Sequence, residues 1–109
     1  MYEVGMVKHI VMWTLKSSAD GRSKEENLQE MKKRLQDLKD KIDTVKYLEV
    51  GLNFNLAEDA YDIVLYSEFE NREGLDAYQA HPAHIEARDF VRKVRLNKRV
   101  VDYEYVTSK

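Results

Sequence analysis

The chain has 109 residues, a formal net charge of −2 and a calculated isoelectric point near 5.9. This mildly acidic balance disfavours nucleic acid as a partner, and the absence of cysteine excludes disulfides and thiolate zinc sites. Residues 1–13 lack the basic start and apolar run of a signal peptide, and no apolar run of about 18 residues is present. We therefore expect a cytoplasmic protein that does not enter a membrane, with a single domain over residues 1–109 and a core between about residues 6 and 105.

Residues 7–16, VKHIVMWTLK, are typical of a strand, with Val7, His9 and Val11 on one face and Ile10 and Met12 on the other. A polar break at residues 17–23 precedes a helix over residues 24–42. The apolar side chains of this helix recur at three- and four-residue steps: Leu28, Met31, Leu35, Leu38 and Ile42. Ser23 and Glu26 fit a capping box at its start.

Two strands follow, at residues 45–52 and 62–69. Asn71 suits the cap of a short helix that ends near residue 80, and Pro82 suits the first turn of another helix. A last strand covers residues 99–106. The order β-α-β-β-α-β predicts an α+β fold of the ferredoxin-like kind, a four-stranded antiparallel sheet with the helices on one face.

The second face of this sheet is also apolar. Ile10, Met12, Val64 and Tyr66 lie on it, together with one side of residues 100–105. A sheet with one layer of helices leaves these side chains without cover, so we expect a homodimer that packs sheet to sheet around a two-fold axis.

The segment YQAHPAH, residues 78–84, contains a candidate acid–base site. His84 lies in the first turn of a helix, where the helix dipole lowers its pKa, so the side chain either serves as a neutral general base or simply packs there. Asp102 lies in the middle of a strand, where aspartate is uncommon. It either pairs with a histidine from the facing helix or points into solvent at a sheet edge.

Three further side chains have alternatives of the same kind. Tyr78 either donates a hydrogen bond to an enolate oxygen or is a core aromatic residue. His9 lies on an apolar strand face, where a histidine is usually a core residue, and His81 is expected to be structural, because it precedes Pro82. His81 and His84 lack further ligands at a metal-binding spacing, so no metal is expected.

The opening strand VKHIVMWTLK and the motif YQAHPAH resemble the stress-responsive A/B barrel family. This resemblance implies a dimeric α+β barrel. Some plant members of the family are polyketide cyclases, which close a ring by aldol chemistry without a cofactor. Carried over from them, Tyr78 is a catalytic tyrosine, His84 is the general base, Asp102 supports that base and His9 lines the cavity. Where those cyclases have bulky aromatic residues, this chain has Met31 and Leu35, and it has Arg95 and Lys98 near the last strand.

We therefore expect a cofactor-free pocket for a small hydrophobic or carbonyl compound, with proton abstraction by His84. The residues expected to bind the substrate are His9, Val11, Trp13, Met31 and Leu35. One alternative is a non-catalytic, stress-related dimer that binds a small molecule. Another is a haem-degrading or quinone-forming monooxygenase, since such enzymes share the dimeric barrel.

Overall fold

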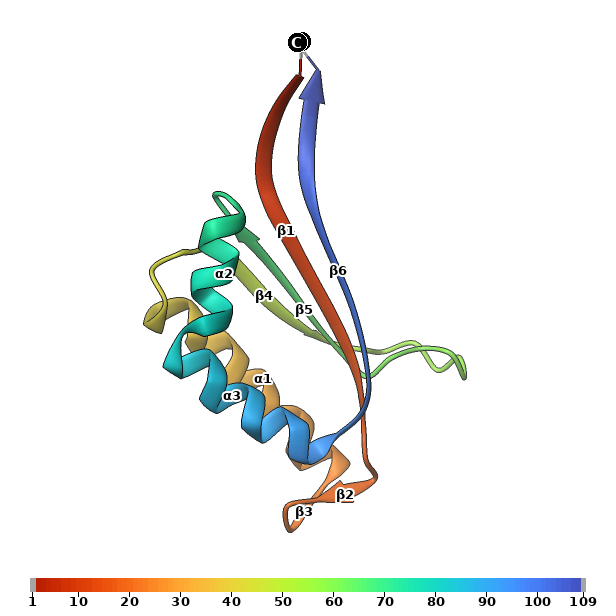
Figure 1. Cartoon of the computed structure of the whole chain (residues 1–109). Helices are drawn as coiled ribbons and strands as arrows, with labels where there is room; N and C mark the ends of the chain where they lie inside the picture. Colours follow the sequence, from red (N-terminus) through yellow and green to blue (C-terminus); the bar gives the residue numbers. More distant parts are fainter. Residues whose placement is uncertain (1, 109) are drawn as a thin grey trace.

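The protein is described by a computed structural model, which covers the backbone of residues 2–108 and the side chains of residues 5–106. Strands β1 (Tyr2–Leu15), β4 (Val45–Leu52), β5 (Ile63–Phe69) and β6 (Arg95–Ser108) form an antiparallel sheet in the order β4-β5-β1-β6. Helices α1 (Lys24–Lys41), α2 (Arg72–Ala80) and α3 (Pro82–Val94) lie together on one face of that sheet (Figure 1). The α+β class and the ferredoxin-like arrangement are thereby confirmed.

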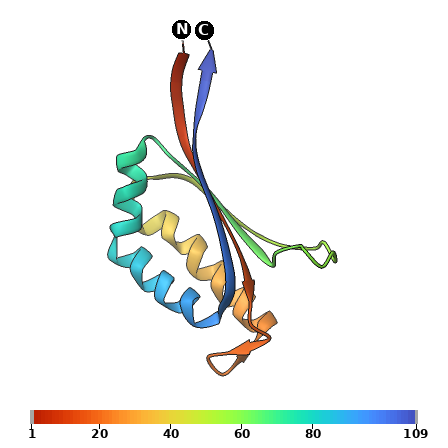
Figure 2. The same cartoon turned by 45° about the vertical axis from the view of Figure 1, so that its right-hand side comes forward.

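The first and last strands of the chain, β1 and β6, are longer than the sequence pattern indicates. β1 begins at Tyr2 and β6 begins at Arg95, because the two strands pair with each other from Tyr2–Ser108 to Leu15–Arg95. Their paired ends extend past the helices as a two-stranded arm, and the segment between β4 and β5 also projects from the body (Figure 2). Backbone pairing between distant segments is not visible in a local apolar pattern, so both strand ends were underestimated.

A small hairpin replaces the polar break expected at residues 17–23. Its strands are β2 (Ser18–Ala19) and β3 (Arg22–Ser23). The turn between them places Asp20 and Gly21 at φ values of 55° and 74°. This left-handed region is open to glycine and tolerated by aspartate, which explains why a glycine occupies this turn.

Each helix begins at a side-chain cap that the sequence supplies. The Ser23 hydroxyl accepts a hydrogen bond from the Glu26 N–H at 3.2 Å, and the Glu26 carboxylate accepts one from the Ser23 N–H at 3.0 Å, so the capping box is confirmed. Asn71 caps α2 through the Gly74 N–H at 2.8 Å. His81 ends α2 and caps α3, which turns the chain between the two helices.

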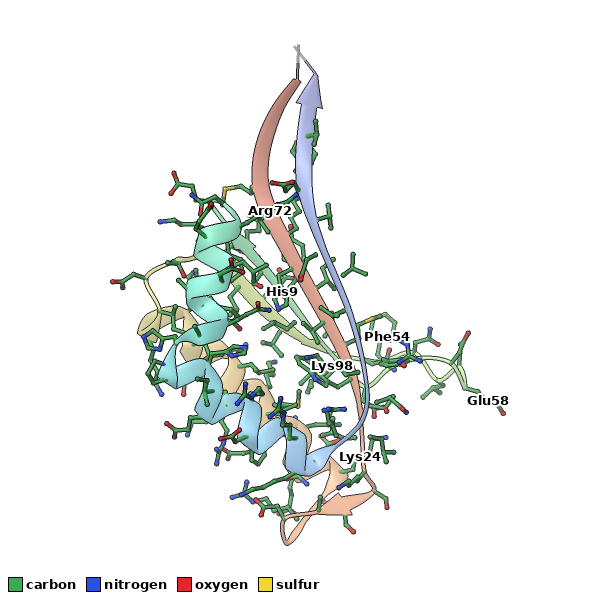
Figure 3. All side chains as sticks on the ribbon, viewed as in Figure 1. His9, Lys24, Phe54, Glu58, Arg72 and Lys98 are labelled. Atoms are coloured by element: carbon green, nitrogen blue, oxygen red, sulfur yellow. The ribbon has the colours of Figure 1, made fainter. Side chains whose placement is uncertain are left out.

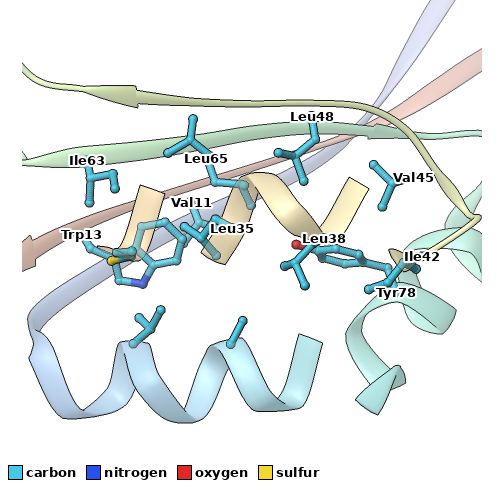
Figure 4. Packing of buried hydrophobic residues seen from close by; sticks show 14 of the residues in the cluster. Val11, Trp13, Leu35, Leu38, Ile42, Val45, Leu48, Ile63, Leu65 and Tyr78 are labelled. Atoms are coloured by element: carbon cyan, nitrogen blue, oxygen red, sulfur yellow. The ribbon is translucent and has the colours of Figure 1, made fainter. Parts of the chain in front are cut away.

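The core lies between the helices and the sheet, with Trp13 and Tyr78 toward opposite ends of the layer (Figure 4). The helices cover β4, β5 and β1 well but leave β6 partly open. Val100 is opposite Val11 in the register and so shares its face, yet Val100 is 51% exposed and Val11 only 3%. The gap beside β6 is where the candidate site lies.

The other face of the sheet has no helices against it. Its exposed apolar side chains are Met12, Tyr47, Val101, Tyr103 and Tyr105, with Val101 57% exposed. Lys8 lies over the rings of Tyr66 and Tyr105, at 5.9 Å and 5.1 Å from their centres. The second apolar face expected from the sequence is thus present and uncovered in the described chain. Among the residues described, no helix has the length and apolar character needed to span a bilayer.

Candidate functional site

A cavity of about 220 Å³ opens between α3, β1 and β6. That volume is below the range typical of drug-sized ligands, so it suits a small molecule. Its inner wall is apolar, formed by Val11, Trp13, Leu35, Leu65 and Val91. The polar side chains expected from the sequence, His9, Tyr78, His84 and Asp102, all line it. Residues from both ends of the chain thus meet in one pocket.

His9 and Asp102 are brought together by strand register. They lie directly opposite each other on β1 and β6, with side chains on the face toward the helices. His9 Nδ1 is hydrogen-bonded to Asp102 Oδ1. His9 is 4% exposed, whereas the Asp102 side chain is 42% exposed. The carboxylate fixes the tautomer with the proton on Nδ1 and stabilises positive charge that forms on the ring.

The predicted pairing of Asp102 with His84 is wrong, because His9 occupies that carboxylate instead. The prediction assumed that the hydrogen-bond donor to Asp102 comes from the facing helix, but the neighbouring strand β1 supplies one, His9. A cross-strand neighbour is closer than a helical residue across the layer. The expectation that His9 is a core histidine with its hydrogen bond satisfied is confirmed, and His9 also lines the pocket.

His84 lies in the first turn of α3, after Pro82. Its Nδ1 atom is buried and has no hydrogen-bond partner in the described part of the chain. Burial lowers the pKa of His84 to about 4, with further contributions from His9, Arg88 and Lys98, while the backbone of Gln79 acts weakly in the opposite direction. The predicted lowering is confirmed, but burial is the main cause. His84 is therefore neutral near pH 7.

Tyr78 is fully buried beside the two histidines. Its ring centre is 4.7 Å from that of His84 and 6.2 Å from that of His9, both in edge-to-face geometry. Burial raises the pKa of the Tyr78 phenol above its ordinary value. The phenol therefore keeps its proton at neutral pH and is able to donate a hydrogen bond.

The residues expected to bind a substrate divide between the pocket and the core. His9, Val11, Trp13 and Leu35 line the cavity. Met31 does not line it, because it is fully buried in the core beneath the helices. The spacing of Met31 and Leu35 shows only that both side chains point toward the interior of the protein. It does not show which of them reaches the cavity and which stays within the core.

His81 is structural, as expected. Its Nδ1 accepts a hydrogen bond from the Ala83 N–H at 3.0 Å, which caps α3. Within the described residues, no group of three or more His, Asp or Glu side chains is placed to hold a metal ion.

Sequence reasoning missed the basic side chains of the pocket. Arg88, Arg92, Arg95 and Lys98 all line its mouth, and only Arg95 and Lys98 had been noticed as departures from the plant cyclases. The signal was present in the sequence, because His84, Arg88 and Arg92 follow one another at four-residue steps. Such spacing places all three on one face of a helix.

The topology and the pocket define a class: a ferredoxin-like α+β protein with two histidines in a cavity beside its last strand. Within that class, the chain belongs to the family of the stress responsive A/B barrel domain, whose model matches residues 7–105. The resemblance inferred from the two motifs is thus confirmed.

Solved structures of other proteins share this fold. A dimeric, ferredoxin-like protein of unknown function from Bacteroides fragilis is 34% identical, with a TM-score of 0.79, over 96% of this chain and 100% of its own. An Arabidopsis thaliana protein is 28% identical, with a TM-score of 0.75, over 94% and 98% of the two chains. A Nitrosomonas europaea protein described as a candidate antibiotic biosynthesis monooxygenase is 16% identical, with a TM-score of 0.68, over 93% and 90%, and so shows the fold alone. No curated protein matches the chain.

Proposed function

We propose that the pocket binds a small carbonyl compound and that His84 removes a proton from the carbon next to the carbonyl, without a cofactor. The observation that carries this proposal is the state of His84. It is a neutral imidazole whose Nδ1 has no partner within the described residues, and it lines a cavity that also contains a protonated phenol. A base and a hydrogen-bond donor side by side are the two groups that enolate formation needs.

The proposed step moves one proton and one electron pair. The C–H proton goes to His84, and the electron pair of the broken bond forms the enolate. Tyr78 donates a hydrogen bond to the developing enolate oxygen. The enolate carbon then attacks a second carbonyl of the same ligand, the ring closes, and the new alkoxide takes back the proton. No external oxidant or reductant is needed for this aldol step.

His9 and Asp102 also line the pocket in this scheme. Because Asp102 fixes the His9 ring and stabilises positive charge on it, His9 is the other candidate for the proton acceptor. The pKa of about 4 makes His84 a weak base. Separate variants of the two histidines therefore decide which of them takes the proton.

The experiment uses phenylacetone in D₂O as the probe and NMR to follow deuterium exchange at its activated methylene. The wild type is expected to accelerate exchange over buffer, and His84→Gln is expected to lose roughly 10²-fold or more of that acceleration. His81→Asn is the matched control, because it keeps a capping side chain on α3 and lies outside the pocket lining. If His84→Gln keeps full activity and His9→Gln loses it, His9 is the base. If the wild type does not accelerate deuterium exchange over buffer, the proposed catalytic role is rejected.

We also propose that the chain forms a homodimer through the open face of its sheet. The uncovered side chains of that face, including Val101 and Tyr103, support this, as does the dimeric state given for the Bacteroides fragilis relative. Stable dimers of this kind usually bury at least about 2,000 Å² in total. Sedimentation should give about twice the chain mass of 12.9 kDa. A monomer at micromolar concentration would contradict the proposal.

A binding role without turnover is the second candidate. The pKa of about 4 favours it, because a weakly basic His84 is well suited to hydrogen bonding and less suited to proton removal. A monooxygenase role has only the shared fold in its favour. The cytoplasmic location stays a prediction.

A further inference from the structure

The mouth of the pocket concentrates positive charge in a chain whose net charge is −2. Four cationic side chains line it, Arg88 and Arg92 from α3 and Arg95 and Lys98 from β6, against one carboxylate, that of Asp102. Lys98 and His9 both lie on the side of β6 and β1 that faces the helices (Figure 3). The positive charge therefore faces the space that a ligand would occupy.

These cations are largely without counter-ions. Arg88 has a carboxylate within 4 Å, that of Asp89 at 3.6 Å. Arg92, Arg95 and Lys98 form no ion pair in the part of the chain that the structure describes, although other surface cations such as Arg34 and Arg72 do. The Asp102 carboxylate is already engaged by His9. Within the described residues, Asp89 at Arg88 and Asp102 near Lys98 therefore offset the positive charge of the mouth only in part.

Two buried polar atoms of pocket-lining residues also lack partners. Among the described side chains, Arg88 Nε and His84 Nδ1 are both buried without a hydrogen bond, and both residues line the cavity. Buried polar groups are nearly always paired, so these two atoms leave hydrogen-bonding capacity unused beside the cavity. The pKa of Lys98 is lowered, first by burial and then by Arg95 and Arg92, while Asp102 acts in the opposite direction.

We propose that the ligand of this pocket is a small organic anion, with its carboxylate or phosphate held among Arg92, Arg95 and Lys98 and its apolar part against Trp13 and Val11. This inference rests on the proposed function for the position of the pocket and names the class of ligand that enters it. The apolar inner wall and the cationic mouth match the two ends of such a molecule. An anion recognised by arginine gains charge-assisted hydrogen bonds that a neutral analogue lacks.

The test is a binding titration of the full chain, followed by the fluorescence of Trp13, which is the only tryptophan and lines the cavity. The probes are hexanoate, hexyl phosphate and the neutral hexanamide. At least one anion should bind about tenfold or more tightly than hexanamide, and its affinity should fall as salt is added. The two anionic probes distinguish a carboxylate site from a phosphate site.

Charge variants then locate the contact. Arg95→Gln and Lys98→Gln should each weaken the anion about tenfold and leave hexanamide unchanged. Lys93→Gln is the matched control, because it removes the same charge from an exposed position of α3 outside the pocket lining. Equal binding of hexanamide and the anions, equal loss in Lys93→Gln, or no binding of either anion would overturn the inference.

This experiment also separates the two proposals. Binding is measured without any reaction. If the wild type binds an anion but does not accelerate deuterium exchange, the proposal of an anion site is supported and the proposal of a catalytic base is rejected. If the wild type accelerates exchange in phenylacetone but shows no preference for anions, the catalytic base is supported and the anion site is rejected.

Discussion

The neutral state of His84 makes the stability of the protein depend on pH in a defined direction. The pKa of His84 is about 4 in the folded chain and 6.5 in the unfolded chain. Between these values the unfolded chain binds a proton that the folded chain does not, so stability falls as the pH drops through this window. The pKa difference corresponds to at most about 3 kcal/mol. Because His84 is only partly buried, solvent screening reduces this to about 1–2 kcal/mol.

Comparison with His84→Gln isolates this contribution. Denaturant unfolding of both proteins at pH 7 and pH 4.5, at the same protein concentration, gives four free energies of unfolding. The contributions of other titrating groups cancel in the comparison, and equal concentrations hold any effect of dimer dissociation fixed. The wild type should lose about 1–2 kcal/mol relative to the variant between the two pH values. An equal difference at both pH values, or an NMR titration of the His84 ring with its midpoint near 6.5, would refute the reasoning.

Three other changes have expected outcomes of different kinds. Ser23→Ala removes the hydroxyl that accepts the Glu26 N–H, while the bond from the Ser23 N–H to the Glu26 carboxylate needs no side chain. It should lower the free energy of unfolding by about 1 kcal/mol in denaturant melts, with Ser18→Ala, outside any cap, as its control. Leu35→Ala removes a buried side chain between the core and the pocket and should cost about 2–5 kcal/mol in the same assay; a loss below that range would mean that the cavity wall closes around the gap. Val101→Asp places a charge on the open face of the sheet and should shift sedimentation toward the monomer, whereas an unchanged dimer would place the interface elsewhere.

The sequence was sufficient for the fold because local signals agree with one another. The three- and four-residue steps through Leu28, Leu35 and Leu38 define α1, and the caps at Ser23 and Asn71 define where helices begin. The limits of β1 and β6 were not predictable in this way. The ends of β1 and β6 are extended because they pair with each other. Pairing between segments so far apart in the sequence leaves no local pattern.

The sequence predicted which residues make up the site better than it predicted the contacts between them. His9, Tyr78, His84 and Asp102 do share one pocket, but the hydrogen bond of Asp102 goes to His9. Choosing between the two histidines requires the register of β1 against β6, which depends on the whole sheet. The same holds for Met31, whose spacing on α1 does not say whether it lies in the core or in the cavity wall, and which is fully buried in the core.

The cations at the mouth connect the two proposals physically. Burial is the first cause of the low His84 pKa, and after it come His9 and then two of the mouth cations, Arg88 and Lys98, which repel a proton on the ring. An anion bound among Arg92, Arg95 and Lys98 would offset that repulsion, so the proton affinity of His84 would rise when such a ligand is in place. A weak base in the empty pocket would then become a better one in the complex, closer to the range in which a general base is effective. The charge that selects the ligand would in this way also prepare the group that acts on it.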